Sequence, residues 1–425
     1  MTAASPRKRR DPARPRVGLG ASGGAKPKVG LALAGGGPLG AVYEVGALCA
    51  LAEALPGLDF NALDGYVGVS AGGFIAAGLA NGMTPRQLCT SFIENDGPRS
   101  DLIRPNLFFR PALGEYARRL AAVPWLLLQA GWGMAVQHRP LLAATERLGS
   151  ALPTGLFSNA ALQARLARVF SAPGRSNDFR QIQRRLVLVA TDLDSGQAAP
   201  FGLPGWDHVP ISQAVAASAA MPGLFPPEEI EGRWYVDGAL KKTLHATVLL
   251  DLDLDLMICL NPLVPFDASA GHSTHRVLGG ASERIPHLVD GGLPLVLSQT
   301  FRTLIHSRLE LGLKGYEASY PRTDILLFEP DHRDPEMFLA NTFGYSQRRV
   351  LAEHAYQHTR ADLRSRRSDL RRTLQGHGLV LDEAVLDDRH RTLMRQRRRH
   401  SSHAGRTLQR LDEVLNDLQR ALATL

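Results

Sequence analysis

Residues 29–57 of the chain read VGLALAGGGPLGAVYEVGALCALAEALPG, a strand pattern, a glycine-rich turn and a helix pattern in that order. The run Val29–Ala34 is short, apolar and β-prone, and it stops at Gly35-Gly36-Gly37. Apolar residues then recur at helical spacing up to a closing Pro-Gly. Residues 66–79, YVGVSAGGFIAAGL, repeat this order, with an apolar run before Ser70 and an Ala-rich helix pattern after it. Two such units predict strands joined by helices and lying parallel in one sheet.

Four further apolar runs have the length of strands, and helical patterns lie between most of them. These runs are Leu186–Ala190, Trp234–Val236, Leu256–Leu260 and Ile325–Phe328. The alternation of strands and helices predicts an α/β fold with a largely parallel central sheet. From about Gly344 the sequence becomes Arg-rich and helical without a strand pattern, which predicts a C-terminal helical extension.

The bulk composition is that of a globular protein. The 425 residues are 44% hydrophobic and 21% charged, enough to bury a core without disulfide or metal staples. The three cysteines are scattered, and no CxxC pair or Cys/His cluster occurs, so neither a disulfide framework nor a metal site is expected. This usage favours a reducing compartment. No signal peptide is recognised, and the longest apolar stretch, 123–136, is shorter than a membrane span, so a cytoplasmic protein is predicted.

Charge is distributed unevenly along the chain. Residues 1–29 hold eight Lys or Arg and one Asp, and residues 345–425 hold seventeen Arg and ten acidic residues. Because the whole chain carries +8, the middle, 30–344, carries −6. Basic ends suit anionic partners, either phospholipid head groups or nucleic acid. The alternative is a solvated surface with a disordered arm.

The first candidate for chemistry is Gly68-Val69-Ser70-Ala71-Gly72, a G-x-S-x-G between a strand and a helix. A serine hydroxyl becomes a nucleophile when a base takes its proton, and a sharp strand-to-helix turn holds that hydroxyl out of the sheet. The flanking glycines permit such a turn. The alternative is a plain turn in which Ser70 caps the helix.

The second candidate is Gly35-Gly36-Gly37-Pro38-Leu39-Gly40, which also opens a helix. Backbone N–H groups at a helix N-terminus can bind an anion, either a dinucleotide pyrophosphate or the oxyanion of acyl transfer. Pro38 has no N–H, so Gly36, Gly37 and Leu39 are the available donors. A side chain at Gly37 is expected to crowd this turn.

The third candidate is Asp237-Gly238-Ala239, a carboxylate at the end of a predicted strand followed by a tight turn. Such a carboxylate can reach a neighbouring loop, and an ordinary β-turn Asp is the alternative. Upstream, residues 217–227 read ASAAMPGLFPP, small residues running into prolines, which indicates a tightly packed helix entering a rigid turn.

Taken in order, these elements resemble the patatin-like phospholipase family. The resemblance rests on the three candidates, on ATDLDSG at 190–196 and on the 217–227 run, and it covers about residues 29–262. It implies a three-layer α/β/α fold and a serine lipid acyl hydrolase of phospholipase A or lysophospholipase type. It also implies a Ser–Asp dyad without a cofactor, with Ser70 as nucleophile and Asp237 as base. The glycine-rich turn would be the oxyanion hole, with Gly36 and Gly37 as principal donors.

The resemblance divides the chain into four segments and departs from the family pattern at two places. The predicted segments are a disordered basic arm (1–28), the acyl hydrolase core (29–262), an extension packed on it (263–344) and an Arg-rich helical tail (345–425). Many relatives have Arg or Lys where this chain has Leu39, and many continue the Asp-Gly turn toward Asn-x-Pro where this chain reads LKKTL at 240–244. Both departures concern the substrate class more than the chemistry.

Three other readings stay open at this point. An α/β-hydrolase triad would need a late histidine, for which His245, His272, His287 and His306 are candidates. A nucleotide-binding protein would use the turn at 35–40, and a non-catalytic scaffold would use the basic ends. The resemblance favours a lipid or acyl-ester partner and no nucleic acid.

A peripheral contact with anionic membranes is also predicted. Residues 124–134, PWLLLQAGWGM, place two tryptophans beside a leucine run, and tryptophan favours the membrane interface. The basic ends would add electrostatic attraction to such a surface. The alternative is a core or lid helix packed on the domain.

Overall fold

The computed structural model describes residues 26–394, except 97, 99, 104–106, 108–109, 136–150, 269–274, 277–281, 284–286 and 340–346. Residues up to Arg391 form one compact unit, to which all the helices and strands below belong, and Thr392–Leu425 form a second. The predicted arm and the last part of the predicted tail lie outside the described residues. Among the described helices, none combines the length and apolarity needed to cross a membrane.

The centre of the fold is an eight-stranded sheet with the order β10-β7-β1-β2-β3-β6-β5, and β4 also pairs with β3. From β10 to β3 the neighbours are parallel, whereas β4 and β6 run antiparallel to β3. The strands are β1 (Val29–Leu33), β2 (Gly65–Gly68), β3 (Arg185–Asp192), β4 (Ala198–Phe201), β5 (Glu228–Ile230), β6 (Arg233–Asp237), β7 (Leu256–Leu260) and β10 (Asp324–Phe328). All six predicted strand runs are thus confirmed, while β4 and β5 were not predicted. A small separate ladder joins β8 (His275–Arg276) and β9 (Ser282–Glu283).

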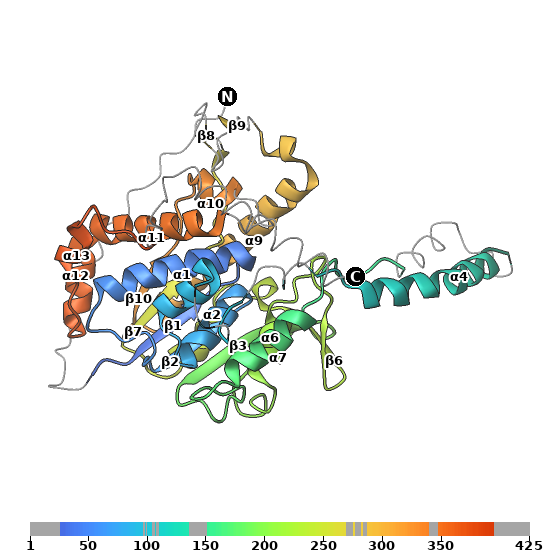
Figure 1. The fold of residues 1–425 in the computed structure, drawn as a ribbon, viewed down its shortest axis with the longest axis horizontal. Coiled ribbons are helices and arrows are strands. Elements are labelled where there is room, and N and C mark those ends of the chain that lie inside the picture. The colour runs from blue at the N-terminus through green and yellow to red at the C-terminus, as the bar shows by residue number, and fades with distance from the viewer. Residues whose placement is uncertain are drawn as a thin grey trace, which may run out of the picture. The chain divides into compact units, whose positions relative to one another are not determined.

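Helices cover both faces of the sheet, as Figure 1 shows. They are α1 (Gly37–Ala54), α2 (Ala71–Ala80), α3 (Pro85–Leu88), α4 (Leu113–Ala135), α6 (Ala160–Phe170), α7 (Ile211–Ser218), α8 (Thr247–Leu250), α9 (Gly292–Ser319), α10 (Pro335–Leu339), α11 (Arg348–Ser365), α12 (Arg367–Gly376) and α13 (Glu383–Asp387), with short turns η1 (Cys89–Glu94), η3 (Gly238–Leu240) and η5 (Leu288–Gly291). The predicted α/β architecture with a helical C-terminal region is confirmed.

Strand residues are apolar on both sides because each side meets helices. β1 and β7 are buried along their whole length, as expected for inner parallel strands. On one face, side chains such as Val67 and Val187 join a core with Leu249 of α8 and Ile305 of α9. The opposite face carries α2, which packs against β1, β2 and β3, and α1 lies next to α2. This places helices on both sides of the sheet, in three layers.

The C-terminal helices dock on α1 through a close helix–helix contact. A Cβ at Gly46 of α1 would lie 2.5 Å from the Ala352 carbonyl oxygen and 2.9 Å from the Ala355 Cβ of α11. Glycine at position 46 therefore lets the two helices approach closely. At the end of α1, Glu53 accepts hydrogen bonds from the Tyr356 hydroxyl (2.6 Å) and from Arg391 Nε (2.5 Å).

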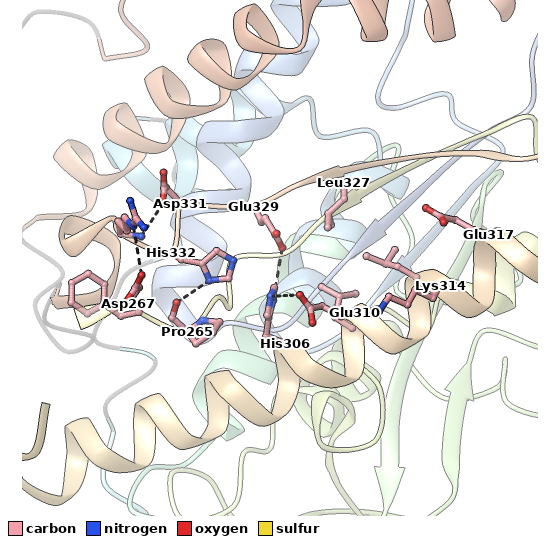
Figure 2. Close-up of a pocket in the computed structure, with 14 residues that line it drawn as sticks. Pro265, Asp267, His306, Glu310, Lys314, Glu317, Leu327, Glu329, Asp331 and His332 are labelled. Atoms are coloured by element: carbon pink, nitrogen blue, oxygen red, sulfur yellow. Dashed lines mark hydrogen bonds and ion pairs between the residues drawn. The ribbon is translucent and has the colours of Figure 1, made fainter. Parts of the chain in front are cut away.

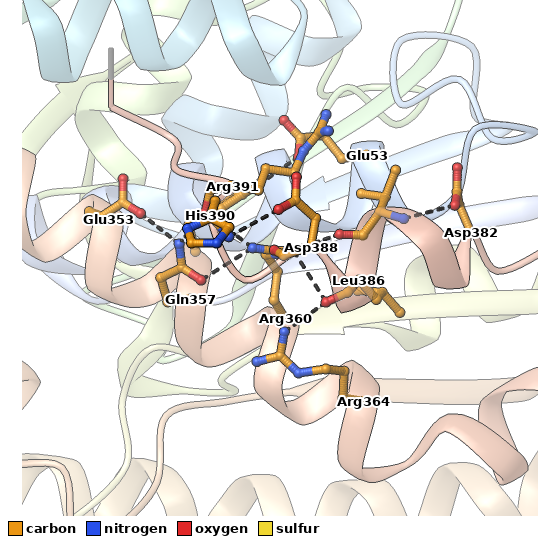
Figure 3. Close-up of polar contacts among 12 residues, drawn as sticks. Glu53, Glu353, Gln357, Arg360, Arg364, Asp382, Leu386, Asp388, His390 and Arg391 are labelled. Carbon is orange, nitrogen blue, oxygen red and sulfur yellow. Dashed lines mark hydrogen bonds and ion pairs between the residues drawn. The ribbon is translucent and has the colours of Figure 1, made fainter. Parts of the chain in front are cut away.

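A buried arginine on α11 holds the last described turns in place (Figure 3). Arg360 is 1% exposed, and its guanidinium donates to the carbonyls of Val385 (2.6 Å), Leu386 (3.2 Å), Asp388 (2.7 Å) and Arg391 (3.2 Å). These carbonyls lie at and beyond the end of α13, where no further helical turn satisfies them. Arg360 supplies the missing donors.

Candidate active site

Ser70 stands on the sharp turn between β2 and α2. Its backbone has φ 54° and ψ −122°, a conformation that a non-glycine residue rarely adopts and that marks stored strain. The turn needs glycine on both sides of Ser70, because a side chain would clash there. A Cβ at Gly68 would lie 2.5 Å from the Gly72 carbonyl oxygen, and one at Gly72 would lie 2.5 Å from the Leu33 carbonyl oxygen. Although Ser70 occupies the N-cap position of α2, its side chain makes no capping hydrogen bond. The capping alternative therefore does not account for this hydroxyl.

Ser218, at the end of α7, fixes the backbone of the nucleophile turn. Its Oγ accepts the Ser70 N–H at 2.8 Å and donates its own proton to the Val189 carbonyl of β3 at 2.7 Å. Ser218 is fully buried, so these two bonds define its hydroxyl orientation. The sequence placed this serine in the tightly packed 217–227 run without assigning it a role, because its partner lies 148 residues away.

The pairing of β3 brings Asp237 to the same place. Leu188 pairs with both β2 and β4, and Ala190 pairs with both β4 and β6. A strand has only two edges, so β2 and β6 share one edge of β3, with β6 taking it over where β2 ends. Asp237, opposite Ala190, therefore lies just beyond the end of β2, where Ser70 stands.

The turn after Asp237 lies against β3 and the residue before the nucleophile. A Cβ at Gly238 would meet the Val189 carbonyl oxygen at 2.1 Å and Val69 Cγ1 at 3.1 Å. Only glycine fits between these groups. The glycine of the Asp-Gly-Ala motif is thus explained by close packing beside the elbow rather than by a positive φ.

The Asp237 carboxylate is fully buried, and only one of its two oxygens accepts a hydrogen bond. Its Oδ1 accepts the Ala239 N–H at 2.9 Å, and its Oδ2 has no hydrogen-bond partner. Burial raises the pKa of Asp237 from 3.8 to about 6, and the nearby Ser70 hydroxyl and the Ala239 N–H oppose this rise. A fully buried carboxylate with one oxygen left over differs from the surface turn residue that was the alternative. It is a base whose free oxygen can accept the serine proton.

The glycine-rich turn completes the site. A Cβ at Gly35 would lie 3.1 Å from the Ser70 Cβ, 3.7 Å from its Oγ and 3.2 Å from the Ala239 Cβ, so this backbone touches both halves of the site. In the described part of the chain, the N–H groups of Gly36 and Gly37 make no hydrogen bond. Two free donors at the start of α1, beside the serine, match the requirement for an oxyanion hole.

Within the glycine-rich turn, the backbone groups of Gly37, Pro38 and Gly40 differ in what they can offer. The Gly40 N–H already bonds the Gly36 carbonyl at 2.9 Å as part of α1, and Pro38 has none to offer. A Cβ at Gly37 would meet nothing within 4 Å, so the expected crowding is wrong. What requires glycine at position 37 is its φ of +59°, which is strained for other residues.

The histidines considered for a triad do not contact the carboxylate of Asp237 in the described residues. His245 Nε2 lies 3.4 Å from the Gly238 carbonyl oxygen, and burial lowers the pKa of His245 to about 4. His306 lies beside Glu310 and Glu329, and His287 is exposed at the start of η5. His272 lies outside the described residues.

Comparison with known proteins places this constellation in a family. The model of the family described as patatin-like phospholipase matches residues 31–250, which is about half of the chain and includes Ser70, Asp237 and the turn at 35–40. The chain belongs to the patatin-like phospholipase family. It is accordingly a lipolytic hydrolase, and the predicted patatin-like fold is confirmed.

Three solved structures match parts of this chain. VipD from Legionella pneumophila is 16% identical, with a TM-score of 0.33, over 78% of this chain and 67% of that one. The type III effector protein ExoU is 15% identical, with a TM-score of 0.31, over 80% of this chain and 53% of that one. ExoU in its heterodimeric complex with SpcU from Pseudomonas aeruginosa is 22% identical, with a TM-score of 0.23, over 47% of this chain and 38% of that one. The chain therefore spans about half of the ExoU chain or less, and at these TM-scores the similarity says nothing about activity.

The patatin-like motifs that flank the site also touch one another. Asp192 Oδ1 accepts the N–H groups of Asp194 and Ser195 and closes the turn of the 190–196 motif. Lys241, in the segment that departs from the common family pattern, donates to the Gly196 carbonyl at 2.6 Å. Lys241, where the sequence departs from the family pattern, thus stabilises the turn that follows β3. The arrangement of Ser70 and Asp237 is unaffected.

Proposed function

We propose that this patatin-like protein hydrolyses a lipid ester with Ser70 as nucleophile, Asp237 as base and the Gly36 and Gly37 N–H groups as oxyanion hole. The observation that carries the proposal is the convergence of a strained serine, a buried carboxylate with a free oxygen and two unused backbone donors. Each group is unfavourable for stability alone. Together they match the needs of acyl transfer.

The chemistry follows from these positions. Asp237 accepts the Ser70 proton as the Ser70 Oγ attacks the ester carbonyl. The resulting oxyanion accepts hydrogen bonds from the N–H groups of the glycine-rich turn. The carbon–oxygen bond to the alcohol breaks, and the alcohol leaves with the proton from Asp237. Water then attacks the acyl-enzyme with the same carboxylate as base, which restores the serine. A pKa of about 6 makes Asp237 a better proton acceptor near neutral pH than an ordinary aspartate.

The competing mechanism is a Ser–His–Asp triad that uses His245. This residue lies beside the acid turn, but it contacts the Gly238 carbonyl instead of a carboxylate oxygen. The dyad predicts that Asp237→Asn loses turnover and that His245→Ala retains it. Loss of turnover in His245→Ala as well as in Asp237→Asn would instead support the triad.

Binding to a lipid surface is part of the proposal. On α4, Trp125, Leu128 and Trp132 recur three and four residues apart and are 63%, 66% and 64% exposed. The alternative of a packed core helix therefore does not describe this helix. From Leu120 to Ala135 the helix has no charged residue. Exposed tryptophans beside leucines favour the interface of an anionic bilayer, where the basic ends would add attraction.

The membrane part is tested by co-sedimentation with vesicles. Full-length protein should bind anionic vesicles more strongly than neutral ones, and raised salt should weaken that binding. Trp125→Ser with Trp132→Ser should reduce sedimentation, whereas the exposed Trp234→Ser on β6 should not. Unchanged binding by the α4 variant would remove this helix from the proposal and leave the dyad untouched.

The catalytic part is tested by fluorophosphonate labelling and a lipid panel. Wild type should be labelled and should hydrolyse at least one ester among phospholipids, lysophospholipids and neutral lipids. Ser70→Ala should lose both properties while keeping its circular dichroism spectrum and thermal midpoint. The remote, exposed Ser365→Ala is the control. Persistent labelling of Ser70→Ala would place the nucleophile elsewhere.

The proposal also includes the four-segment division of the chain, in which residues 29–262 form the hydrolase core.

A further inference from the structure

A second cluster of reactive side chains lies at the C-terminal ends of β7 and β10, outside the region matched by the family. His306 of α9, and Glu329 and His332 after β10, each offer one ligand atom, and these atoms lie within 4.8 Å of one another. His306 Nδ1 is 4.0 Å from Glu329 Oε2, and the two imidazole rings meet edge to face at 4.9 Å. Figure 2 shows the three side chains pointing toward one another across a cavity of about 1470 Å³.

The outer nitrogens of both histidines already face acceptors. His332 Nδ1 lies 3.1 Å from the Pro265 carbonyl oxygen, so it carries the proton and leaves Nε2 with a free lone pair. His306 Nε2 lies 3.6 Å from Glu310 Oε1, one turn along α9. This leaves His306 Nδ1, which is buried and has no hydrogen-bond partner. His306 as a whole is only 8% exposed, so its unpartnered nitrogen is directed into the cluster and away from bulk water.

We propose that His306, Glu329 and His332 bind one divalent metal ion, with zinc as the best match. Two imidazole nitrogens and one carboxylate oxygen form a common zinc ligand set, and the cavity leaves a fourth position open to water. Magnesium and calcium prefer all-oxygen sets, which two imidazoles do not supply. The Glu310 carboxylate and the Pro265 carbonyl would accept the outer N–H groups of the two metal-bound histidines and so hold their rings in orientation.

The distances fit an ion after a small contraction. Three ligand atoms within 4.8 Å of one another lie at most about 2.8 Å from a common centre, and zinc–nitrogen bonds are about 2.0–2.1 Å long. No side chain would need to move inward by more than about 0.7 Å, which a change of side-chain torsions can supply. The sequence predicted no metal site because its ligands do not form a cluster along the chain and meet only where α9 crosses the end of β10.

A bound ion would connect α9 to the edge of the sheet that carries the proposed active site. Glu329 Oε2 also accepts a hydrogen bond from Asn261 Nδ2 at 3.3 Å, at the end of β7. The next residue, Pro262, lies against the glycine-rich turn, where a Cβ at Gly36 would meet it at 2.7 Å. The proposed metal site is therefore linked to the proposed oxyanion hole through Asn261, which bonds Glu329, and Pro262, which packs on Gly36. Its ligands nevertheless take no part in the dyad, so binding is expected whether or not the catalytic proposal holds.

The test uses full-length protein stripped with a chelator, then titrated with Zn²⁺ or Co²⁺ alone. Calorimetry should give one saturable site per chain, and bound Co²⁺ should show the intense visible absorption of tetrahedral nitrogen and oxygen coordination. His306→Gln, Glu329→Gln and His332→Gln should each weaken Zn²⁺ binding at least tenfold, and Glu310→Gln should weaken it by about 10- to 100-fold.

Two controls keep the result specific. His287→Gln changes an exposed histidine outside the cluster and should bind Zn²⁺ like wild type, and so should Ser70→Ala. If a ligand variant fails to fold, the Co²⁺ spectrum of the wild type still decides whether histidine and carboxylate ligands surround the ion. The proposal is overturned by absent stoichiometric binding, by ligand variants that bind like wild type, or by an equal loss in His287→Gln.

Discussion

Replacing Asp237 with asparagine should separate stability from activity in a pH-dependent way. Burial raises the pKa of this carboxyl from 3.8 to about 6, so the folded state holds its proton more tightly than the unfolded chain does. At 1.36 kcal/mol per pKa unit, keeping the carboxylate ionised in the fold costs about 3 kcal/mol. The cost is absent below the unfolded pKa of 3.8, grows as the pH rises, and is complete above about 6. Asparagine has the same shape and cannot ionise.

The measurement is urea unfolding of wild type and Asp237→Asn at intervals between pH 4 and pH 8. Contributions from other groups cancel in the difference between the two proteins, so only its change with pH is interpreted. The variant should gain about 2.4 kcal/mol relative to wild type between pH 4 and pH 7, because part of the cost is already present at pH 4. Its hydrolytic activity should be lost throughout, while wild-type turnover should rise through pH 6 as Asp237 ionises. A pH-independent difference, or a wild type that gains on the variant as the pH rises, would refute the desolvation of this carboxylate.

Three other substitutions test neighbouring parts of the structure. Gly35→Ala would place a Cβ 3.1 Å from the Ser70 Cβ and should lower kcat for one ester substrate at least tenfold. Gly114→Ala, which adds a Cβ in open space, should leave kcat unchanged. Ser218→Ala removes the acceptor of the buried Ser70 N–H and should lower the free energy of unfolding in urea by about 1–3 kcal/mol. It should also lower kcat more than it raises KM, and unchanged kinetics would show that Ser218 does not position the nucleophile. Arg360→Leu leaves the Val385 and Asp388 carbonyls without their donor and should destabilise the fold by about 3 kcal/mol or more. The exposed Arg372→Ala should cause no measurable change, and equal unfolding midpoints would contradict this account.

The sequence alone determined the local elements and the chemistry-bearing residues. Hydrophobic runs identified six strands of the sheet, and the inner parallel strands β1, β2 and β7 are apolar because both of their faces are buried. The glycines around Ser70 and after Asp237 could be read as turn positions because their requirement is local. The short strands β4 and β5 were missed, since three or four residues against a hairpin partner carry little periodicity.

Only the tertiary structure decided which of these groups meet. Asp237 lies beyond the end of β2 because β6 takes over the edge of β3 that β2 leaves, and strand pairing of this kind depends on contacts between distant segments. The same holds for the bond from Ser70 to Ser218 and for the meeting of His306 with Glu329 and His332. Exposure is likewise a tertiary property: the apolar face of α4 reads like a buried helix in sequence, and only the fold leaves it uncovered. Local propensity acts over a few residues, whereas burial, pairing and unpartnered polar atoms are set by segments that the chain brings together from far apart.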